Sequence, residues 1–442
     1  MRDIVVTAIV FGSLPFILRR PWLGIIMWCW LSYMNPHKLA WGFAYSMPFA
    51  LMVALATLVG LLFSREPKKF PVTRETVVLL LFFGWMFVTT NTAFFPELAW
   101  PQFEKVAKIL LMTFVTLILI NTREKLDAMI WVIVLSIGFF GVKGGLFTIA
   151  TGGSHRVYGP ATSFIAGNNE VALALVMIIP LMRYLQLQAK RALVRHGLSA
   201  AMFLSAIAAI GSQSRGALLA IVAMGGFLWL KSRGKVLTGV LILAATAVIA
   251  SLMPESWYER MRTIETYQQD ASALGRINAW WVAFNVASAR PLVGGGFEMF
   301  QAPTFQNYAP EPSRVHDVHS IYFEVLGEHG FVGLTLFLLL YAFAWFTARR
   351  IARAARKEPS LKPYGDLALM LQVSLVGYAV GGAFLGLGYF DLPYHLVSAL
   401  VIAAILLERE TAQPPAESAG AAAAARTPAV GVVNRRRQMR AL

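Results

Sequence analysis

The chain has 442 residues, of which 57% are hydrophobic and only 14% charged. Soluble globular domains carry about a quarter charged residues, so this balance excludes an ordinary soluble protein. Continuous apolar runs long enough to cross a bilayer recur along the sequence and predict an all-α, polytopic membrane protein. The formal net charge is +16, and the basic residues cluster between the apolar runs. Such clustering follows the positive-inside rule and argues against nucleic-acid binding.

The apolar runs predict about twelve transmembrane helices, because the two shortest runs at the start could form a hairpin that does not fully cross. In chain order the expected helices cover 4–18, 22–34, 43–63, 76–90, 106–120, 127–149, 170–186, 198–211, 216–230, 236–252, 331–348, 367–388 and 392–407. We therefore expect four parts in the chain. They are N-terminal transmembrane helices in 1–253, one large extramembrane loop in 254–330, C-terminal transmembrane helices in 331–408 and a disordered basic tail in 409–442.

Basic and lysine-poor loops alternate along the chain and give the orientation of the helices. The basic loops, expected in the cytoplasm, are 64–69, 123–125, 190–195, 231–235 and 348–357. The lysine-poor loops, expected to face outward, are 91–102, 151–169, 211–214 and 254–329. The tail ends in the basic stretch 435–440 and is expected in the cytoplasm, where it would meet anionic lipid.

Within the outward loop, residues 272–288 have the pattern of an amphipathic helix, with Arg276, Trp280 and Phe284 along one face. Its tryptophans suit a helix that lies on the bilayer surface. Pro291 and the glycines 294–296 end the helix in a turn.

Several kinds of catalytic chemistry have no signature in this sequence. Cys29 is the only cysteine and stands inside an apolar run, so we interpret it as a packing residue. The nucleophile elbow of α/β-hydrolases, the phosphate-binding loop of nucleotidases and the His-Glu-x-x-His pair of zinc proteases do not occur.

Outward-facing arginines are the first candidate functional residues. Arg215 lies in the short turn 212–216 between two apolar helices, where the positive-inside rule disfavours a cation. It is either a snorkelling residue or an anion clamp, since guanidinium presents a planar fork of donors that matches phosphate. The following helix start, with its serines and Gly216, would add backbone N–H groups. Arg276 has the same two interpretations, and Arg156 is a weaker third candidate. Together they predict a substrate that carries a diphosphate.

Histidines and carboxylates cluster just before the apolar run 331–346. The cluster comprises His316, Asp317, His319, Glu324, Glu328 and His329. On a helix, His316 and His319 would share a face while Asp317 points elsewhere, so a metal site lacks a third ligand. A buried structural histidine is a second alternative. A general base at His319 is favoured, because imidazole titrates near neutrality. Glu324 and Glu328 could orient it.

In combination, these features resemble the O-antigen ligase and O-antigen polymerase superfamily of bacterial envelope glycosyltransferases. The matching stretches are Ser214-Arg215-Gly216, Gly275-Arg276 through Trp280 with the turn Pro291 to Phe297, and His319-Ser320-x-Tyr322 through Gly330 and Gly333. The N-terminal part, including 35–38, resembles O-glycosylation ligases linked to exosortase systems. The likeness extends to about residue 408, and Ser320 stands where many members have asparagine.

The resemblance implies a multi-pass protein of the bacterial inner membrane with its active site on the periplasmic side. The implied reaction moves a glycan from undecaprenyl diphosphate to a hydroxyl of lipid A–core, with inversion and without metal or cofactor. It implies catalytic roles for Arg215, Arg276 and His319. We further expect the substrate to contact Arg156, Tyr322, Trp280 and His316.

Other activities stay open at this point. Relatives use a growing glycan or a protein side chain as acceptor, so an O-antigen polymerase or a protein O-oligosaccharyltransferase is the alternative within the superfamily. A membrane transporter would also have many helices, but transporters gather polar residues near the midplane rather than in an outer loop. A non-catalytic scaffold leaves His319 unexplained.

Overall fold

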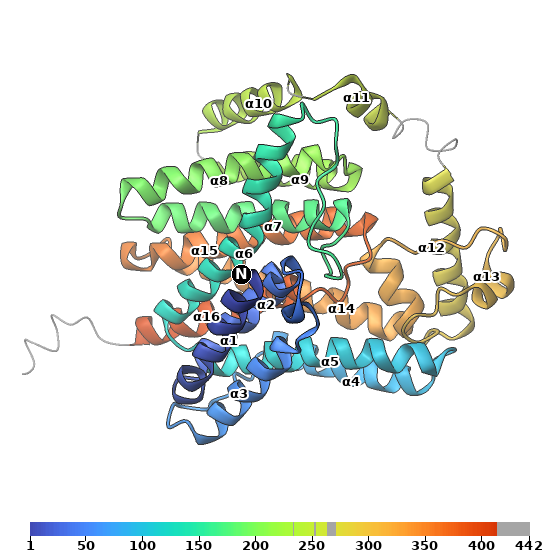
Figure 1. Ribbon diagram of the computed structural model, residues 1–442, viewed down its shortest axis with the longest axis horizontal. Coiled ribbons are helices and arrows are strands. Elements are labelled where there is room, and N and C mark those ends of the chain that lie inside the picture. The colour runs from blue at the N-terminus through green and yellow to red at the C-terminus, as the bar shows by residue number, and fades with distance from the viewer. Residues whose placement is uncertain (233, 252, 263–270, 413–442) are drawn as a thin grey trace, which may run out of the picture.

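The computed structural model describes residues 1–232, 234–251, 253–262 and 271–412. Within these ranges every regular element is a helix, in agreement with the all-α prediction. Figure 1 shows most of the long helices running side by side, whereas α12 (Ala271–Ala289) lies across one end of them. The disordered tail predicted for 409–442 falls outside the described residues from 413 onward.

Each apolar run forms a helix. The helices are α1 Arg2–Arg19, α2 Trp22–Met34, α3 Phe49–Phe63, α4 Arg74–Asn91, α5 Pro96–Leu119, α6 Arg123–Ala150, α7 Asn168–Gln188, α8 Ala192–Gly211, α9 Arg215–Lys231, α10 Lys235–Ser251, α14 Ile321–Ala354, α15 Lys362–Gly381 and α16 Asp391–Ala412. The segment before α14 adds α11 Glu255–Arg262, α12 and α13 Ala302–Tyr308. Short 3₁₀ turns, η1 Pro36–Leu39, η2 Phe43–Ser46, η4 Pro359–Leu361 and η5 Gly382–Phe384, join some of them.

Six of the described helical segments are long and apolar enough to cross a membrane. They are Arg123–Ala150, Asn168–Gln188, Ala192–Gly211, Ile321–Ala354, Pro359–Phe384 and Asp391–Ala412. Further apolar helices, such as α2 and α3, are shorter. A multi-pass membrane protein is thus supported, and the expected number of about twelve spans is not confirmed.

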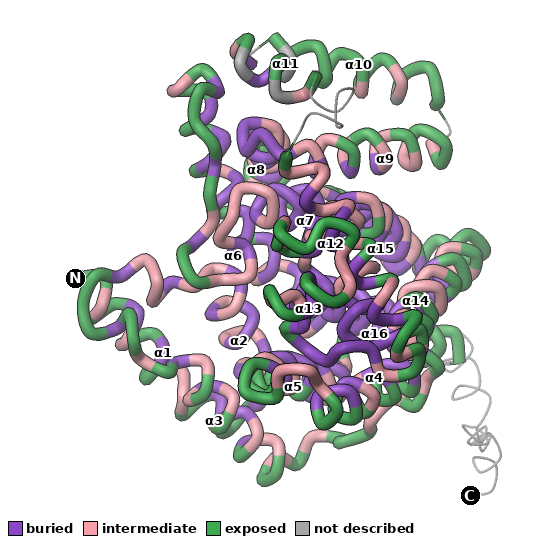
Figure 2. The backbone as a smooth tube through the Cα atoms, turned by 90° about the vertical axis from the view of Figure 1, so that its right-hand side faces the viewer, coloured by how far each residue is buried: buried purple, intermediate pink, exposed green. Residues whose placement is uncertain are grey.

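The centre of the bundle consists of α7 and α16, whose most apolar stretches are 78% and 89% buried. Figure 2 shows this burial, with α1, α3 and α10 largely exposed at the periphery. Helices that are apolar on every side belong in such a centre. A buried polar side chain at this centre can be satisfied by a neighbouring helix, as with Ser374 of α15, whose hydroxyl donates to the Met177 carbonyl of α7 at 2.7 Å.

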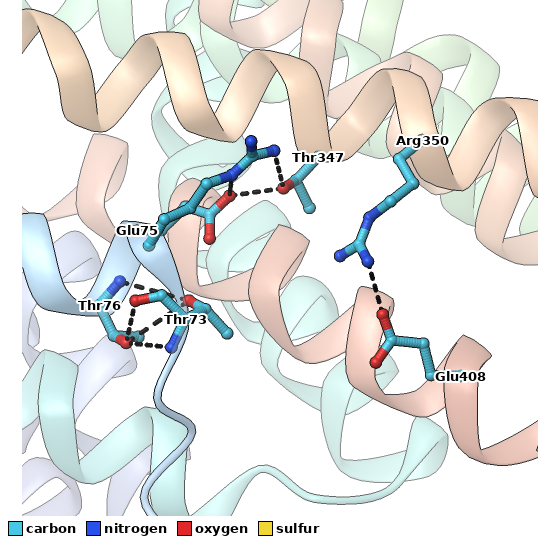
Figure 3. A network of polar contacts seen from close by, with 7 residues as sticks. Thr73, Glu75, Thr76, Thr347, Arg350 and Glu408 are labelled. Carbon is cyan, nitrogen blue, oxygen red and sulfur yellow. Dashed lines mark hydrogen bonds and ion pairs between the residues drawn. The ribbon is translucent and has the colours of Figure 1, made fainter.

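The loops collect at two ends of the bundle in the groups that their charges predict. At the basic end, Lys125 pairs with Glu66 at 2.6 Å and Arg350 with Glu408 at 2.6 Å, the second pair being visible in Figure 3. At the opposite end, the Asn168 amide donates to the Ser212 carbonyl at 2.8 Å. The lysine-poor loops therefore lie together, away from the basic ones.

A break in α14 joins the helix to the preceding loop. Gly330 has φ 67°, which interrupts the helical hydrogen bonds and exposes the carbonyls of Gly327 and Glu328. The N–H groups of Gly295 and Gly296 donate to these two carbonyls at 2.8 and 2.9 Å. The turn predicted at residues 294–296 thus exists, and its glycines allow the close approach that these bonds require.

Candidate active site

Arg215 and Arg276 line the same small pocket, although they lie on different helices. Arg215 is the first residue of α9, which the Ser214 hydroxyl caps by accepting from the Ala217 N–H at 3.3 Å. Arg276 lies near the start of α12. The cavity has a volume of about 110 Å³. Its other lining residues are Asn169, Ser214, Gly216, Ser272 and Phe384.

This arginine pocket has the composition of an anion site. Guanidinium groups remain charged at any physiological pH and can each donate two parallel hydrogen bonds to phosphate oxygens. The start of α9 adds the positive end of a helix dipole. The backbone N–H groups expected to assist are partly engaged, because the Ser214 hydroxyl occupies the N–H of Ala217. The guanidinium pair is therefore the main source of positive charge there.

The two histidines expected on one helical face lie instead in a non-helical segment. Helix α14 begins at Ile321, after Ser320 in the N-cap position, which serine favours. His319 has φ +42°, a left-handed conformation that is incompatible with a continuing helix and often marks functional sites. The expected helix was thus wrong, yet the rings of His316 and His319 have centroids 5.4 Å apart.

Asp317 is the carboxylate that holds the imidazole of His319. Its Oδ2 lies 3.2 Å from Nδ1 of His319, and its carbonyl oxygen lies 3.1 Å from the same nitrogen. This pairing favours a proton on Nδ1 and leaves Nε2 to accept one. The expectation that Asp317 points away is therefore wrong. Glu324 and Glu328, the expected partners, accept from the Gly388 N–H at 2.9 Å and the Tyr389 hydroxyl at 2.6 Å.

Helix α12 connects the arginine pocket to the non-helical residues 314–320, which carry His316 and His319 and which we call the histidine segment. The Trp280 indole donates to the Val318 carbonyl at 2.8 Å, and its ring stacks on Phe323 with centroids 5.1 Å apart. One residue before Arg276, Gly275 packs so closely that a Cβ there would stand 2.7 Å from Cδ2 of His316. Helix α12 thus packs against the residues that carry the imidazoles and also supplies Arg276 to the arginine pocket.

The close approach at Gly275 gives a first prediction. Gly275→Ala should force His316 and its neighbours to shift and lower kcat/KM for the reaction about tenfold or more, since sub-ångström positioning matters in catalysis. The thermal midpoint should change little, because alanine is a better helix former than glycine. Gly226→Ala is the matched control, as nothing lies within 4 Å of a Cβ there. Equal kinetics in the two variants would show that the close packing of Gly275 against His316 does not affect the reaction.

A second cavity, which we call the acidic cavity, was not anticipated. Its volume is about 440 Å³, and it adjoins the histidine segment. The lining includes Glu298, Asp317, Glu324, Glu328, His316, Gln102, Gln301, Phe164 and Tyr389. Burial and the negative charge of Asp317 raise the pKa of the Glu298 carboxyl. Carboxylates and amides at this density suit sugar hydroxyl groups, which donate hydrogen bonds to them.

The remaining predicted residues are placed as follows. Arg156 lies outside the arginine pocket and donates through Nε to the Gln213 side chain at 3.3 Å, next to the turn that carries Arg215. The Tyr322 hydroxyl donates to the Ala379 carbonyl at 2.8 Å. His329 is fully buried, with Nδ1 2.7 Å from the Thr89 hydroxyl. Of the expected contact residues, only His316 lines a described cavity of this site.

Residues 200–338 match the O-antigen ligase family. This match supports the O-antigen ligase and polymerase superfamily. Residues 1–190 match a family of unknown function, DUF5935. No match is found among curated proteins.

The O-antigen ligase match indicates a glycosyl-transferring enzyme in general, and a lipid-linked glycan substrate fits that family. Together with the apolar helices, the match indicates a multi-pass membrane protein. The ligase match contains Arg215, Arg276, Asp317 and His319. The acidic cavity also uses Gln102 and Phe164, which belong to the N-terminal match. No pattern in the sequence predicts that Gln102 and Phe164 line the acidic cavity, because their position depends on how α5 and the loop before α7 pack against α14.

Proposed function

We propose that this protein is an O-antigen ligase that transfers a glycan from undecaprenyl diphosphate to a hydroxyl of lipid A–core, on the periplasmic side of the inner membrane. The observation that carries the proposal is the arginine pocket formed by Arg215 and Arg276 beside the Asp317–His319 pair. An anion site next to an oriented imidazole matches a reaction with a diphosphate leaving group and a hydroxyl nucleophile.

The arginine pocket acts on the donor. As the bond between the anomeric carbon and the diphosphate oxygen breaks, its electron pair stays on the diphosphate, and negative charge grows there. Two guanidinium groups stabilise that charge in a preorganised geometry, in the role that a divalent metal has in other glycosyl transfers. Their planar forks also hold the lipid diphosphate in one orientation.

The imidazole acts on the acceptor. Nε2 of His319 takes the proton of the acceptor hydroxyl while its oxygen forms the new bond to the anomeric carbon. Attack opposite the leaving diphosphate inverts the configuration of that carbon. The imidazolium that results lies 3.2 Å from the Asp317 carboxylate, which stabilises its charge. Such general-base assistance contributes about 10² to 10⁴ in rate.

The experiment that tests this function is a comparison of acceptors. Purified protein in lipid nanodiscs is given an undecaprenyl diphosphate-linked glycan with lipid A–core, with a second lipid-linked glycan, or with a serine-rich peptide. The proposal expects transfer to lipid A–core. Transfer to the second glycan alone would indicate a polymerase, and transfer to the peptide alone a protein O-oligosaccharyltransferase. Intact donor with every acceptor would contradict the proposed function.

A second prediction concerns metal ions. None of the described residues that line the arginine pocket is a carboxylate, and the arginines themselves supply the positive charge. Transfer measured with excess chelator should therefore equal transfer without it. A large loss that added Mg²⁺ or Mn²⁺ restores would contradict the arginine mechanism.

A further inference from the structure

A third cavity at the same end of the bundle is formed entirely by the N-terminal part of the chain. It has a volume of about 360 Å³. Its lining residues are Trp28, Leu31, Ser32, Asn35, His37, Lys38, Ala50, Lys105, Lys108, Ile109, Thr162, Ser163 and Phe164. All of them lie within residues 1–190, the match of unknown function. We call it the lysine cavity, because it holds three lysines and, among its described lining residues, no carboxylate.

Lys105 is the cation best placed to receive an anion there. Its Nζ lies 3.9 Å from the centre of the Phe164 ring, and no described carboxylate oxygen lies within 4.0 Å of it. Lys108, one turn further along α5, pairs with Glu104 at 3.4 Å. Lys38 donates to the Tyr45 carbonyl at 2.9 Å, which leaves two of its three ammonium hydrogens for another acceptor.

The surroundings of the lysines are polar on one side and apolar on the other. The Thr162 hydroxyl and one N–H of the Asn35 amide are the hydrogen-bond donors for a ligand there. The other lining donors are engaged within the protein, because Ser32 donates to Asp391, Ser163 to the Pro160 carbonyl and the second Asn35 N–H to the Ser32 carbonyl. The Nδ1 atom of His37 is buried and has no hydrogen-bond partner among the described residues. Trp28, Leu31 and Ile109 line the same cavity with apolar surface. Positive charge, hydrogen-bond donors and an apolar wall together fit the anionic headgroup of an amphiphile.

The lysine cavity leads toward the imidazole. Phe164 lines both this cavity and the acidic cavity, and the acidic cavity includes Asp317, which holds His319. The carboxyl groups of the acidic cavity accept hydrogen bonds from sugar hydroxyls. An amphiphile with its anionic group at the lysines could therefore extend a sugar chain past Phe164 to the imidazole. The donor diphosphate belongs at the arginine pocket, which shares no lining residue with the lysine cavity.

We propose that the lysine cavity is the acceptor site and binds a phosphate group of the acceptor lipid, with Lys105 as its principal contact. The proposal rests on the ligase function given above and assigns a role to the N-terminal part of the chain. Two cationic sites with no lining residue in common would hold the two anionic lipids apart.

The test uses phosphorylated lipid A–core and the same acceptor after phosphatase treatment, with full-length protein in phosphatidylcholine nanodiscs. Lys105→Gln should raise the KM for the phosphorylated acceptor about tenfold, as expected for a partly exposed charge-assisted contact, and leave kcat and the donor KM unchanged. Removal of the phosphates should raise the KM of the wild type similarly, and the variant should then lose nothing further. Lys143→Gln is the matched control, because Lys143 is exposed on α6 outside the cavity.

Two outcomes would overturn the proposal. If Lys105→Gln affects both acceptors equally, the lysine does not recognise phosphate. If instead the variant differs from the wild type only when phosphatidylglycerol is added to the nanodiscs, the cavity holds a bilayer lipid and not the acceptor. Acceptor binding is also measured directly in the absence of donor. Phosphate-dependent binding without any transfer would contradict the ligase function and support the site, so the two failures are distinguishable.

Discussion

Arg215→Lys and Arg276→Lys should each lower kcat/KM for glycan transfer by about 10²-fold or more, although the positive charge is kept. Lysine is a compact point charge and cannot make the two parallel bonds that guanidinium makes to a phosphate group. Because both residues line one pocket of about 110 Å³, both should contact the same diphosphate. The double variant should therefore lose less than the product of the two single losses. Transfer kinetics on purified variants, checked for expression and thermal stability, measure this.

Arg290→Lys is the matched control for these variants. Arg290 lies at the same end of the bundle but outside the arginine pocket, where its guanidinium donates to the Thr92 carbonyl at 2.7 Å. Its replacement should leave turnover nearly unchanged. Near-normal turnover in both Arg215→Lys and Arg276→Lys would show that these arginines are snorkelling residues, and the proposed clamp would then be wrong.

His319→Ala should lower transfer by about 10² to 10⁴ while the donor still binds, since the arginines and not the imidazole hold the diphosphate. Asp317→Asn should have a smaller effect on kcat, because it leaves the imidazole in place and weakens only its orientation and the charge stabilisation. Donor binding and transfer are measured on the same preparations.

His316→Ala is the appropriate histidine control and should retain substantial activity. His329→Ala is expected to retain activity only as far as it folds, because His329 is fully buried and packs against Phe297 with ring centroids 4.6 Å apart. A His319→Ala variant that transfers at nearly the wild-type rate would contradict the base assignment. So would a variant that fails solely because the donor no longer binds.

Much of the fold could be predicted because a membrane helix needs a long apolar run, and such runs are visible without an alignment. Arg215 was recognisable for a related reason, as a cation on the side where the charge pattern disfavours one. Its pairing with Arg276 in one pocket could only be inferred from the resemblance. That pairing depends on how α12 crosses the end of the bundle (Figure 1).

The histidine segment shows why other features were missed. Ser320 in the N-cap position signals that α14 begins after the histidines, whereas the three-residue spacing of His316 and His319 alone predicts a shared helical face. The partnership of Asp317 with His319 follows from the non-helical backbone and has no periodic signature. Glu298 enters the acidic cavity because the glycine turn before it docks on the break at Gly330, a long-range contact.

The most direct measurement of the central claim is the stoichiometry of the reaction in nanodiscs that contain the wild-type protein, the lipid-linked glycan and lipid A–core. Free undecaprenyl diphosphate and glycosylated lipid A–core are quantified together over time. The account predicts that they appear in equal amounts, and that His319→Ala produces neither at a comparable rate. Lipid-linked glycan that remains intact in the presence of folded wild-type protein and acceptor would contradict it.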